Sequence, residues 1–171
     1  MKMIGIAIIL ISCTAIGFFI DAWQKERVKE LEELIYAFEI LKGEIDYRLT
    51  PLIEACHMIT QMTSYSIGKL FDSFQIHLTD RQLVDARVMW DEAIKENKEA
   101  FHLTEEDYAV LGEFGNIVGH LDKEMQKRNI ELLLNKLTKV KEDAKEKYNR
   151  TSKMYKGIGI LIGACISIVL I

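Results

Sequence analysis

Charge is absent from both ends of this sequence and dense between them, and this layout limits the possible folds more than any other feature. All 26 acidic residues lie within Asp21–Glu146, and of the 22 basic residues only Lys2 lies outside residues 21–156. Hydrophobic residues make up 49% of the chain, which is too many for a disordered protein. We therefore expect three parts: two apolar ends, residues 1–20 and 157–171, and a charged middle, residues 21–156.

The N-terminal end has the length of a membrane helix. Residues 3–20 carry no charge, and 18 helical residues rise about 27 Å, close to the ~30 Å hydrocarbon core of a bilayer. Trp23 follows at the level of the membrane interface. The C-terminal apolar run holds only 15 residues, which is short for a span, and Met154 and Tyr155 can extend it, with Lys156 reaching to the interface. The sequence predicts one transmembrane helix in residues 1–20 and a second in residues 157–171.

Other interpretations of the two ends stay open. A signal peptide also has an apolar run, although Lys2 is the only basic residue before it. Leu10-Ile11-Ser12-Cys13 is similar to a bacterial lipoprotein cleavage box, which predicts an exported lipoprotein cleaved before Cys13. The C-terminal run also fits a buried core helix.

Basic residues next to the two apolar ends predict the orientation. Three of them follow the first end and three precede the second, whereas the opposite flanks hold only Lys2. The positive-inside rule then places residues 21–156 in the cytoplasm and both termini outside the cell membrane, in a two-pass topology with lipids as partners. The six residues are Lys25, Arg27, Lys29, Arg150, Lys153 and Lys156.

The charged middle has the pattern of a helical bundle. The chain has a single proline, Pro51, which favours long uninterrupted helices. Apolar residues such as Leu31, Leu34 and Phe38 recur at helical spacing, and no strand alternation appears. Residues 122–156 contain neither Gly nor Pro, so the last helix is expected to run into the C-terminal apolar end. The predicted fold class is all-α, a cytoplasmic bundle of about five to six helices whose first and last helices continue into the membrane.

Local signals predict the helix boundaries. The first helix is expected to continue through Asp21–Leu49. Thr50 suits the N-cap of the next helix and Pro51 its first position. Thr60–Ser66 has the composition of a connector, before a helix that carries Ile67, Leu70, Phe71, Phe74 and Leu78. Thr79–Gln82 matches the capping-box pattern and predicts the start of a further helix.

The second half of the middle holds two more boundaries. Asn97–His102 reads as a turn. Thr104 is followed by Glu105, Glu106 and Asp107, and acids in a first turn are favoured by the helix dipole. Gly119 is expected to stop that helix.

No arrangement of residues typical of an enzyme or a metal site appears. The four histidines, His57, His77, His102 and His120, show no metal-ligand spacing, and Cys56 is expected to be a small core residue. Gly112 and Gly115 lie in an apolar helical pattern and not in a phosphate-binding loop. We therefore expect no enzymatic activity, no metal and no cofactor. Nucleic-acid binding is not expected because residues 21–156 carry a net charge of −5.

Gly159 and Gly163 form a GxxxG pattern in the C-terminal apolar end. Small residues four apart let membrane helices approach closely. The pattern predicts packing against the first membrane helix or against a second copy, although a lipid-facing pair of glycines has the same spacing.

Charge in the middle is unevenly distributed. Residues 80–122 hold 11 acids against four bases, whereas residues 123–156 hold 11 bases against five acids. Acidic and basic faces packed against each other explain this, and so does a basic helix beside anionic lipids or an acidic partner. The acidic stretch is the farthest in sequence from both ends, so we expect it to dock a cytosolic partner through Glu105, Glu106 and Asp107.

Several short motifs give the chain a family resemblance. Over essentially its whole length it resembles the stage III sporulation protein AB family of endospore-forming bacteria. Two positions depart from the family pattern, Leu121 and Met125. The motifs are Glu44-Ile45-Asp46-Tyr47, Thr50-Pro51-Leu52 with Glu54-Ala55, Leu103-Thr104-Glu105-Glu106-Asp107, Leu111, Phe114-Gly115, Gly119, Asp122, Gln126 and Tyr155–Gly163.

The resemblance implies a role in endospore formation. Members of the family act in the mother cell, in a channel complex that connects it to the forespore, and look like a reduced inner-membrane platform protein of type II secretion and type IV pilus machines. The implied partners are a cytoplasmic hexameric ATPase and other membrane proteins of the sporulation channel, and a homo-oligomer is left open. The alternative is a membrane-anchored helical signalling or scaffold protein with no ATPase partner.

Overall fold

The computed structural model describes the backbone of residues 2–48, 50–80, 85–118 and 123–170. It leaves the side chains of residues 2–10, 13, 47, 123, 153 and 155–170 outside the description. The chain divides into two compact units, residues 1–28 with 142–171 and residues 29–141. Each unit is considered by itself below.

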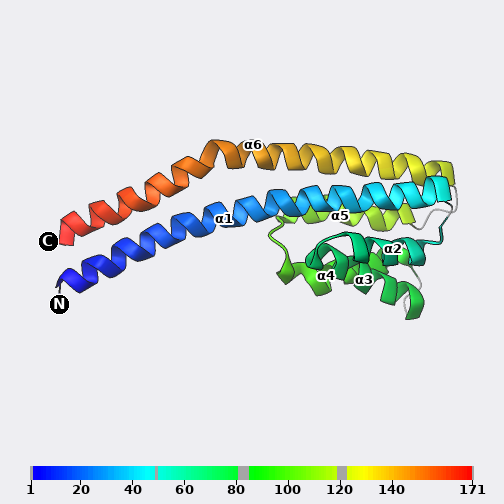
Figure 1. Cartoon of the computed structure of the whole chain (residues 1–171), viewed down its shortest axis with the longest axis horizontal. Helices are drawn as coiled ribbons and strands as arrows, with labels where there is room; N and C mark the ends of the chain where they lie inside the picture. The colour runs from blue at the N-terminus through cyan, green and yellow to red at the C-terminus, as the bar shows by residue number, and fades with distance from the viewer. Residues whose placement is uncertain (1, 49, 81–84, 119–122, 171) are drawn as a thin grey trace. The chain divides into compact units, whose positions relative to one another are not determined.

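The described residues form six α-helices and two short helical turns, with no strand among them, so the predicted all-α class and helix number are confirmed (Figure 1). In chain order the elements are α1 Lys2–Gly43, the π-helical turn η1 Glu44–Arg48, α2 Leu52–Met62, α3 Tyr65–Asp80, α4 Ala86–Asn97, the 3₁₀ turn η2 Lys98–Ala100, α5 Glu105–Val118 and α6 Lys123–Leu170.

The first and last helices are the longest. α1 has 42 residues and α6 has 48, so each continues from an apolar end of the chain into residues of the 29–141 unit. Neither contains proline, because Pro51 stands just before α2. The predicted continuation of the first helix beyond Asp21 is confirmed as far as Gly43, after which the chain makes the π-helical turn η1.

The unit of residues 29–141 is built on an aromatic core. Five aromatic rings from α1, α3, α4 and α5 are at most 1% exposed, and neighbouring ring centroids lie 4.8–6.2 Å apart in mostly edge-to-face pairs. Burying one such ring contributes about 1.5–3 kcal/mol. Trp90 also donates a hydrogen bond from Nε1 to the carbonyl of Leu111, 2.9 Å away, so its polar atom is satisfied inside the core. The five rings are Phe38, Phe71, Phe74, Trp90 and Phe114.

Two glycines allow the helices around this core to approach closely. A Cβ at Gly115 of α5 would lie 3.0 Å from the Cα of Arg87 in α4, which is closer than side chains normally pack. A Cβ at Gly68 of α3 would lie 3.1 Å from the carbonyl oxygen of Thr60 in α2. These glycines therefore set the spacing of the α4–α5 and α2–α3 pairs.

The predicted capping box at Thr79–Gln82 is wrong where the structure describes it. Thr79 lies in the last turn of α3, and its hydroxyl donates to the carbonyl of Gln75 at 2.8 Å. α4 begins instead at Ala86, with the carboxylate of Asp85 accepting from the N–H of Arg87 at 2.9 Å. The pattern misled because Asp is as good an N-cap as Thr, and the apolar stripe of α3 runs on to Leu78. Arg81, Gln82 and Leu83 lie outside the described residues, as do Gly119 and His120.

Two other boundaries shift by a few residues. Pro51 stands at the N-cap of α2, so the helix begins at Leu52, one residue later than predicted. The hydroxyl of Thr50 donates to Glu44 Oε2 at 2.8 Å instead of capping α2. The predicted connector Thr60–Ser66 shrinks to two residues between α2 and α3. It is short because Thr63 still donates its hydroxyl back to the carbonyl of Ile59, which prolongs the last turn of α2.

In the unit of residues 1–28 and 142–171, α1 turns small and polar residues inward. Gly17, Asp21 and Val28 are buried, and Thr14 and Gln24 are half-buried. These positions alternate in steps of three and four, so they form one stripe on the helix. The hydroxyl of Thr151 in α6 donates to the carbonyl of Lys147 at 2.6 Å and lies 3.3 Å from Gln24 Oε1, so the two helices of this unit are in polar contact here.

The large apolar side chains of the same part of α1 point outward. Ile11, Ile16, Phe18 and Phe19 are 52–72% exposed. Among the described residues, no helix has both the length and the apolarity that crossing a membrane requires. The two predicted transmembrane segments include the side chains of residues 2–10 and 157–170, which lie outside the description, so both segments remain predictions.

Candidate functional site

The predicted docking residues Glu105, Glu106 and Asp107 open α5. The helix start is held by a reciprocal pair of hydrogen bonds: the N–H of Thr104 donates to Asp107 Oδ2 at 2.8 Å, and the N–H of Asp107 donates to Thr104 Oγ1 at 3.4 Å. This is a capping box with Asp in place of the usual Glu. The predicted helix start at Thr104 is therefore confirmed, and Asp107 is fully buried.

Glu105 and Glu106 are exposed, unlike Asp107. The side chain of Glu105 is 82% exposed and pairs with Lys98 of η2 at 2.7 Å. An ion pair this exposed contributes little to stability, so the carboxylate can exchange Lys98 for another cation. The structure thus separates the three acids: Asp107 fixes the helix start, and the other two face solvent beside it.

Tyr108 ties the start of α5 to the turn η2 that follows α4. Its hydroxyl donates to the carbonyl of Lys98 at 3.0 Å, and the Lys98 ammonium lies 5.2 Å from the centre of its ring. Partial burial, together with the charges of Glu30, Glu105 and Asp107, raises the pKa of Tyr108 to about 12. The phenol therefore stays protonated and keeps donating its hydrogen bond at any physiological pH.

A second contact ties residues 98–104, the connector between α4 and α5, to α1. The backbone N–H of His102 donates to Glu30 Oε2 at 2.7 Å, and the ring Nδ1 lies 2.8 Å from Glu30 Oε1. Glu30 is only 9% exposed, and Phe101 and Leu103 on either side of His102 are buried. The connector between α4 and α5 is consequently anchored on both sides of the turn predicted at Asn97–His102.

Sequence reasoning missed Glu30, Lys98 and Tyr108 as parts of this site. Glu30 lies 72 residues before His102, so no local spacing links the two residues. Lys98 and Tyr108 are ten residues apart and belong to different elements, and their contact depends on how the connector turns. Only the three acids could be predicted from the sequence, because they follow the capping residue Thr104 and so mark a helix start.

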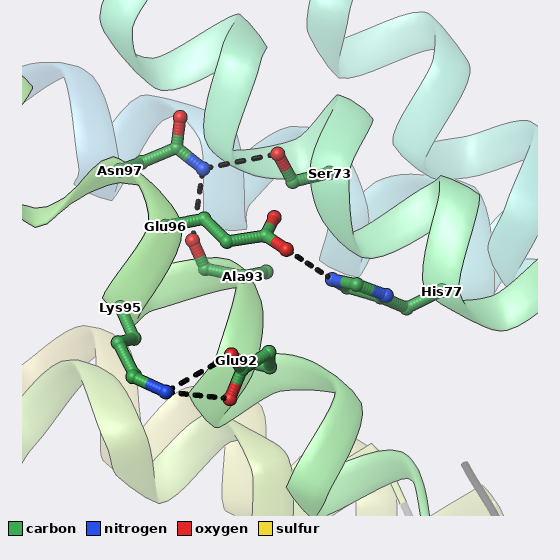
Figure 2. Close-up of polar contacts among 7 residues, drawn as sticks. All are labelled: Ser73, His77, Glu92, Ala93, Lys95, Glu96 and Asn97. Atoms are coloured by element: carbon green, nitrogen blue, oxygen red, sulfur yellow. Dashed lines mark hydrogen bonds and ion pairs between the residues drawn. The ribbon is translucent and has the colours of Figure 1, made fainter. Parts of the chain in front are cut away.

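Polar contacts also join α3 to α4 (Figure 2). The Asn97 amide donates to Ser73 Oγ at 3.0 Å and to the carbonyl of Ala93 at 2.8 Å. His77 Nε2 lies 3.2 Å from Glu96 Oε1, so this histidine faces a carboxylate of the next helix. The end of α4 is thus fixed by α3 before the chain enters η2.

The remaining candidates have ordinary environments. Cys56 is fully buried, as predicted, and burial raises the pKa of its thiol to about 12, which makes it unreactive. His57 contacts Gln61 at 3.1 Å on the surface of α2. Within the described ranges, no three His, Cys, Asp or Glu side chains gather as a metal-ligand set. Gly159 and Gly163 belong to α6, but their surroundings lie outside the described part, so their packing remains a prediction.

Comparisons with known proteins agree with one another. The family model for stage III sporulation protein AB matches residues 2–171. The chain is 29% identical over 170 residues to stage III sporulation protein AB of Bacillus subtilis strain 168, covering 99% of both chains. A solved structure of stage III sporulation protein AB superposes with a TM-score of 0.68 at 28% identity, covering 72% of this chain and 97% of the other.

Proposed function

The chain belongs to the stage III sporulation protein AB family, and from that premise we propose that it is an integral membrane platform of the channel complex between mother cell and forespore, where it docks a cytoplasmic hexameric ATPase. The observation that carries the proposal is the continuity of α1 and α6. Each helix joins an apolar end of the chain to the folded 29–141 unit, as a platform anchored at both ends requires. Other membrane proteins of the channel, and further copies of this chain, are the remaining partners in the proposal.

Side-chain exposure in α1 supports the membrane part of the proposal. Phe19 is 72% exposed and Ile11 69% exposed, whereas Gly17 and Asp21 are buried. In water this arrangement leaves the most apolar side chains without cover. In a bilayer lipid covers them, and helix contacts are normally made by small and polar residues.

The proposed topology places residues 21–156 in the mother-cell cytoplasm and both termini outside, as the flanking basic residues predict. An ATPase in the cytoplasm then has access to every helix of the 29–141 unit. In an exported lipoprotein cleaved before Cys13, the same unit would be out of its reach.

The start of α5 supports the docking part. Glu105 and Glu106 are exposed on a rigid base, because the capping box of Thr104 and Asp107 fixes the helix start below them. Lys98 already shows that Glu105 accepts a lysine ammonium at 2.7 Å. We therefore place the contact at Glu105 and Glu106, with basic side chains of the ATPase as their partners, and assign Asp107 to the support of the surface.

Co-purification of the full-length chain with the ATPase from membranes tests this contact. Glu105→Lys with Glu106→Lys reverses the surface charge without touching the buried cap, and is expected to reduce retained ATPase at least about tenfold. The matched control is Glu39→Lys with Glu54→Lys, two exposed acids on α1 and α2 with the same change of net charge.

The control is expected to retain the ATPase at the wild-type level. Equal retention by both double variants contradicts docking at α5. If no ATPase is retained by the wild-type chain either, the protein is a membrane-anchored scaffold without an ATPase partner.

A further inference from the structure

Two ion pairs join the end of α1 to the start of α6 within the 29–141 unit. Lys42 Nζ of α1 lies 2.7 Å from Glu131 Oε1 of α6. Asp46 of the following turn η1 lies 3.6 Å from Lys127 Nζ of the same helix. The Asp46 side chain is 8% exposed, and the other three are between 29% and 47% exposed.

Along the sequence each set has a cation followed by an anion, and because the two sets run antiparallel, each cation faces an anion. Lys42 and Asp46 are four residues apart, as are Lys127 and Glu131. The first residue of each set pairs with the second residue of the other set, as in two antiparallel helices. Both pairs therefore belong to a single antiparallel register. Each element carries one cation and one anion, so the order of charge along α1 and η1 complements the order along α6.

The alternating charges penalise sliding in both directions. If α6 moves by one turn, about 5.4 Å, in one direction, Lys42 comes level with Lys127 and Glu131 loses its partner, although Asp46 comes level with Lys123. A one-turn move in the other direction brings Asp46 level with Glu131. Like charges facing each other are unfavourable, and here each slipped register creates such a pair.

Apolar packing alone discriminates less well between these registers. Leu133 and Leu137 of α6 are both buried and stand one turn apart, so a slip of one turn replaces one leucine by the other. On α1 the buried residues Leu34, Phe38 and Leu41 repeat with the same period. A helical stripe presents apolar side chains every turn and thus leaves the register underdetermined.

We infer that Lys42, Asp46, Lys127 and Glu131 form a register lock, a set of charges that holds α1 and α6 against sliding past each other. Its role is to select one register and not to add stability, since three of the four side chains are 29–47% exposed and ion pairs in contact with solvent contribute little. The lock holds together the parts of α1 and α6 that belong to the 29–141 unit. This inference does not depend on the proposed docking of an ATPase.

A charge swap distinguishes the effect of the alternating charge order from the effect of the two ion pairs. Lys42→Glu with Glu131→Lys keeps both native pairs attractive, but gives α1 and η1 two anions and α6 two cations. Both slipped registers then become attractive as well. The matched control is Glu113→Lys with Lys136→Glu. It swaps the charges of an ion pair between α5 and α6, with Lys136 Nζ 2.7 Å from Glu113 Oε2, and leaves the four lock residues unchanged.

Pulsed electron paramagnetic resonance on the full-length chain in detergent reports the register. Spin labels replace Tyr36 on α1 and Met125 on α6, which are 45% and 47% exposed, in a background without other cysteines. Wild type and control are expected to give one distance. The Lys42–Glu131 swap is expected to add a second, shorter distance, different by up to about 5 Å. The slip that brings position 42 level with Lys127 and Asp46 level with Lys123 forms two attractive pairs in the swap, whereas the opposite slip forms only one, and the favoured slip brings the labels closer along the helix axes.

Reversal of all four charges provides the second variant. Lys42→Glu, Asp46→Lys, Lys127→Glu and Glu131→Lys together restore the alternation, so the single wild-type distance is expected to return. A single unchanged distance in the two-residue swap overturns the inference and leaves the register to the apolar core. Loss of the fold in the swap but not in the control also overturns it, because the swap retains both native pairs.

Discussion

The two compact units of this chain differ in where their large apolar side chains lie. In residues 29–141 the five core rings are buried, whereas in residues 11–28 phenylalanine and isoleucine are exposed and glycine and aspartate are buried. Both patterns occur within the single helix α1. The contrast shows that the two parts of one helix have different surroundings: a protein core around Phe38, and around Phe19 a surface where large apolar side chains are exposed, for which the proposed membrane anchor accounts.

The same substitution at two positions of α1 tests this contrast with the largest expected effect. Phe38→Ala removes a fully buried ring that contacts Phe71, Trp90 and Phe114, and is expected to destabilise the 29–141 unit by about 3–5 kcal/mol. Phe19→Ala is expected to leave that stability unchanged. Urea unfolding followed by tryptophan fluorescence measures both, and equal losses for the two variants would erase the distinction between the units.

Two glycines of α5 sharpen the comparison inside the well-packed unit. Gly115→Ala places a Cβ 3.0 Å from the Arg87 backbone and is expected to cost about 1–3 kcal/mol through overpacking. Gly112→Ala meets only Asp91 Oδ1 at 3.8 Å, so it is expected to stabilise the helix by about 0.5–1 kcal/mol. Thermal unfolding by circular dichroism gives the sign of each change. A stabilising Gly115→Ala would show that α4 and α5 are not in tight contact.

The capping box at the start of α5 is expected to have a smaller effect. Thr104→Ala removes the oxygen that accepts from the Asp107 N–H, and a lost N-cap costs about 0.5–2 kcal/mol. Glu106→Gln at the exposed neighbouring position is expected to change stability by less than about 0.5 kcal/mol. Chemical denaturation of both variants checks the pair, and a larger loss for Glu106→Gln would mean that the exposed acid and not the cap holds the helix start.

High pH is expected to lower the stability that Tyr108 contributes at the start of α5. Because the pKa of Tyr108 is raised to about 12 in the folded chain, the folded form holds this proton more tightly than the unfolded form. The resulting stabilisation is complete below the ordinary tyrosine pKa of about 10 and disappears as the pH rises towards 12. Unfolding midpoints from pH 9 to 12 are expected to fall less steeply in Tyr108→Phe than in wild type, and parallel curves would remove Tyr108 as the cause.

Much of the fold was predictable because helix-forming patterns are local. Residues such as Leu34 and Phe38 recur with the helical period, and the buried Ile67, Leu70, Phe71 and Phe74 lie where the sequence predicts the face of the third helix. Boundaries failed where two residues compete for the same role. Thr79 and Asp85 are both good caps, and only the packed length of α3 decides between them.

The candidate site was predictable only in its local part. Thr104 and the acids that follow it form a readable helix start, whereas the Glu30–His102 and Lys42–Glu131 contacts join residues 72 and 89 positions apart. Such pairs depend on how helices pack, and no spacing in the sequence encodes them. The burial of Asp107 beside two exposed glutamates is a result of the same kind, since all three acids look alike in the sequence.

Membrane topology is the most direct test of the central claim that the 29–141 unit lies in the cytoplasm on two membrane anchors. Single cysteines replace the exposed residues Ser64 and Glu99 in a full-length chain without Cys13, Cys56 and Cys165, and intact mother-cell protoplasts are treated with a membrane-impermeant thiol reagent. The account predicts no labelling until the cells are lysed, and rapid labelling afterwards. Labelling of either cysteine in intact cells would place the unit outside and contradict the account.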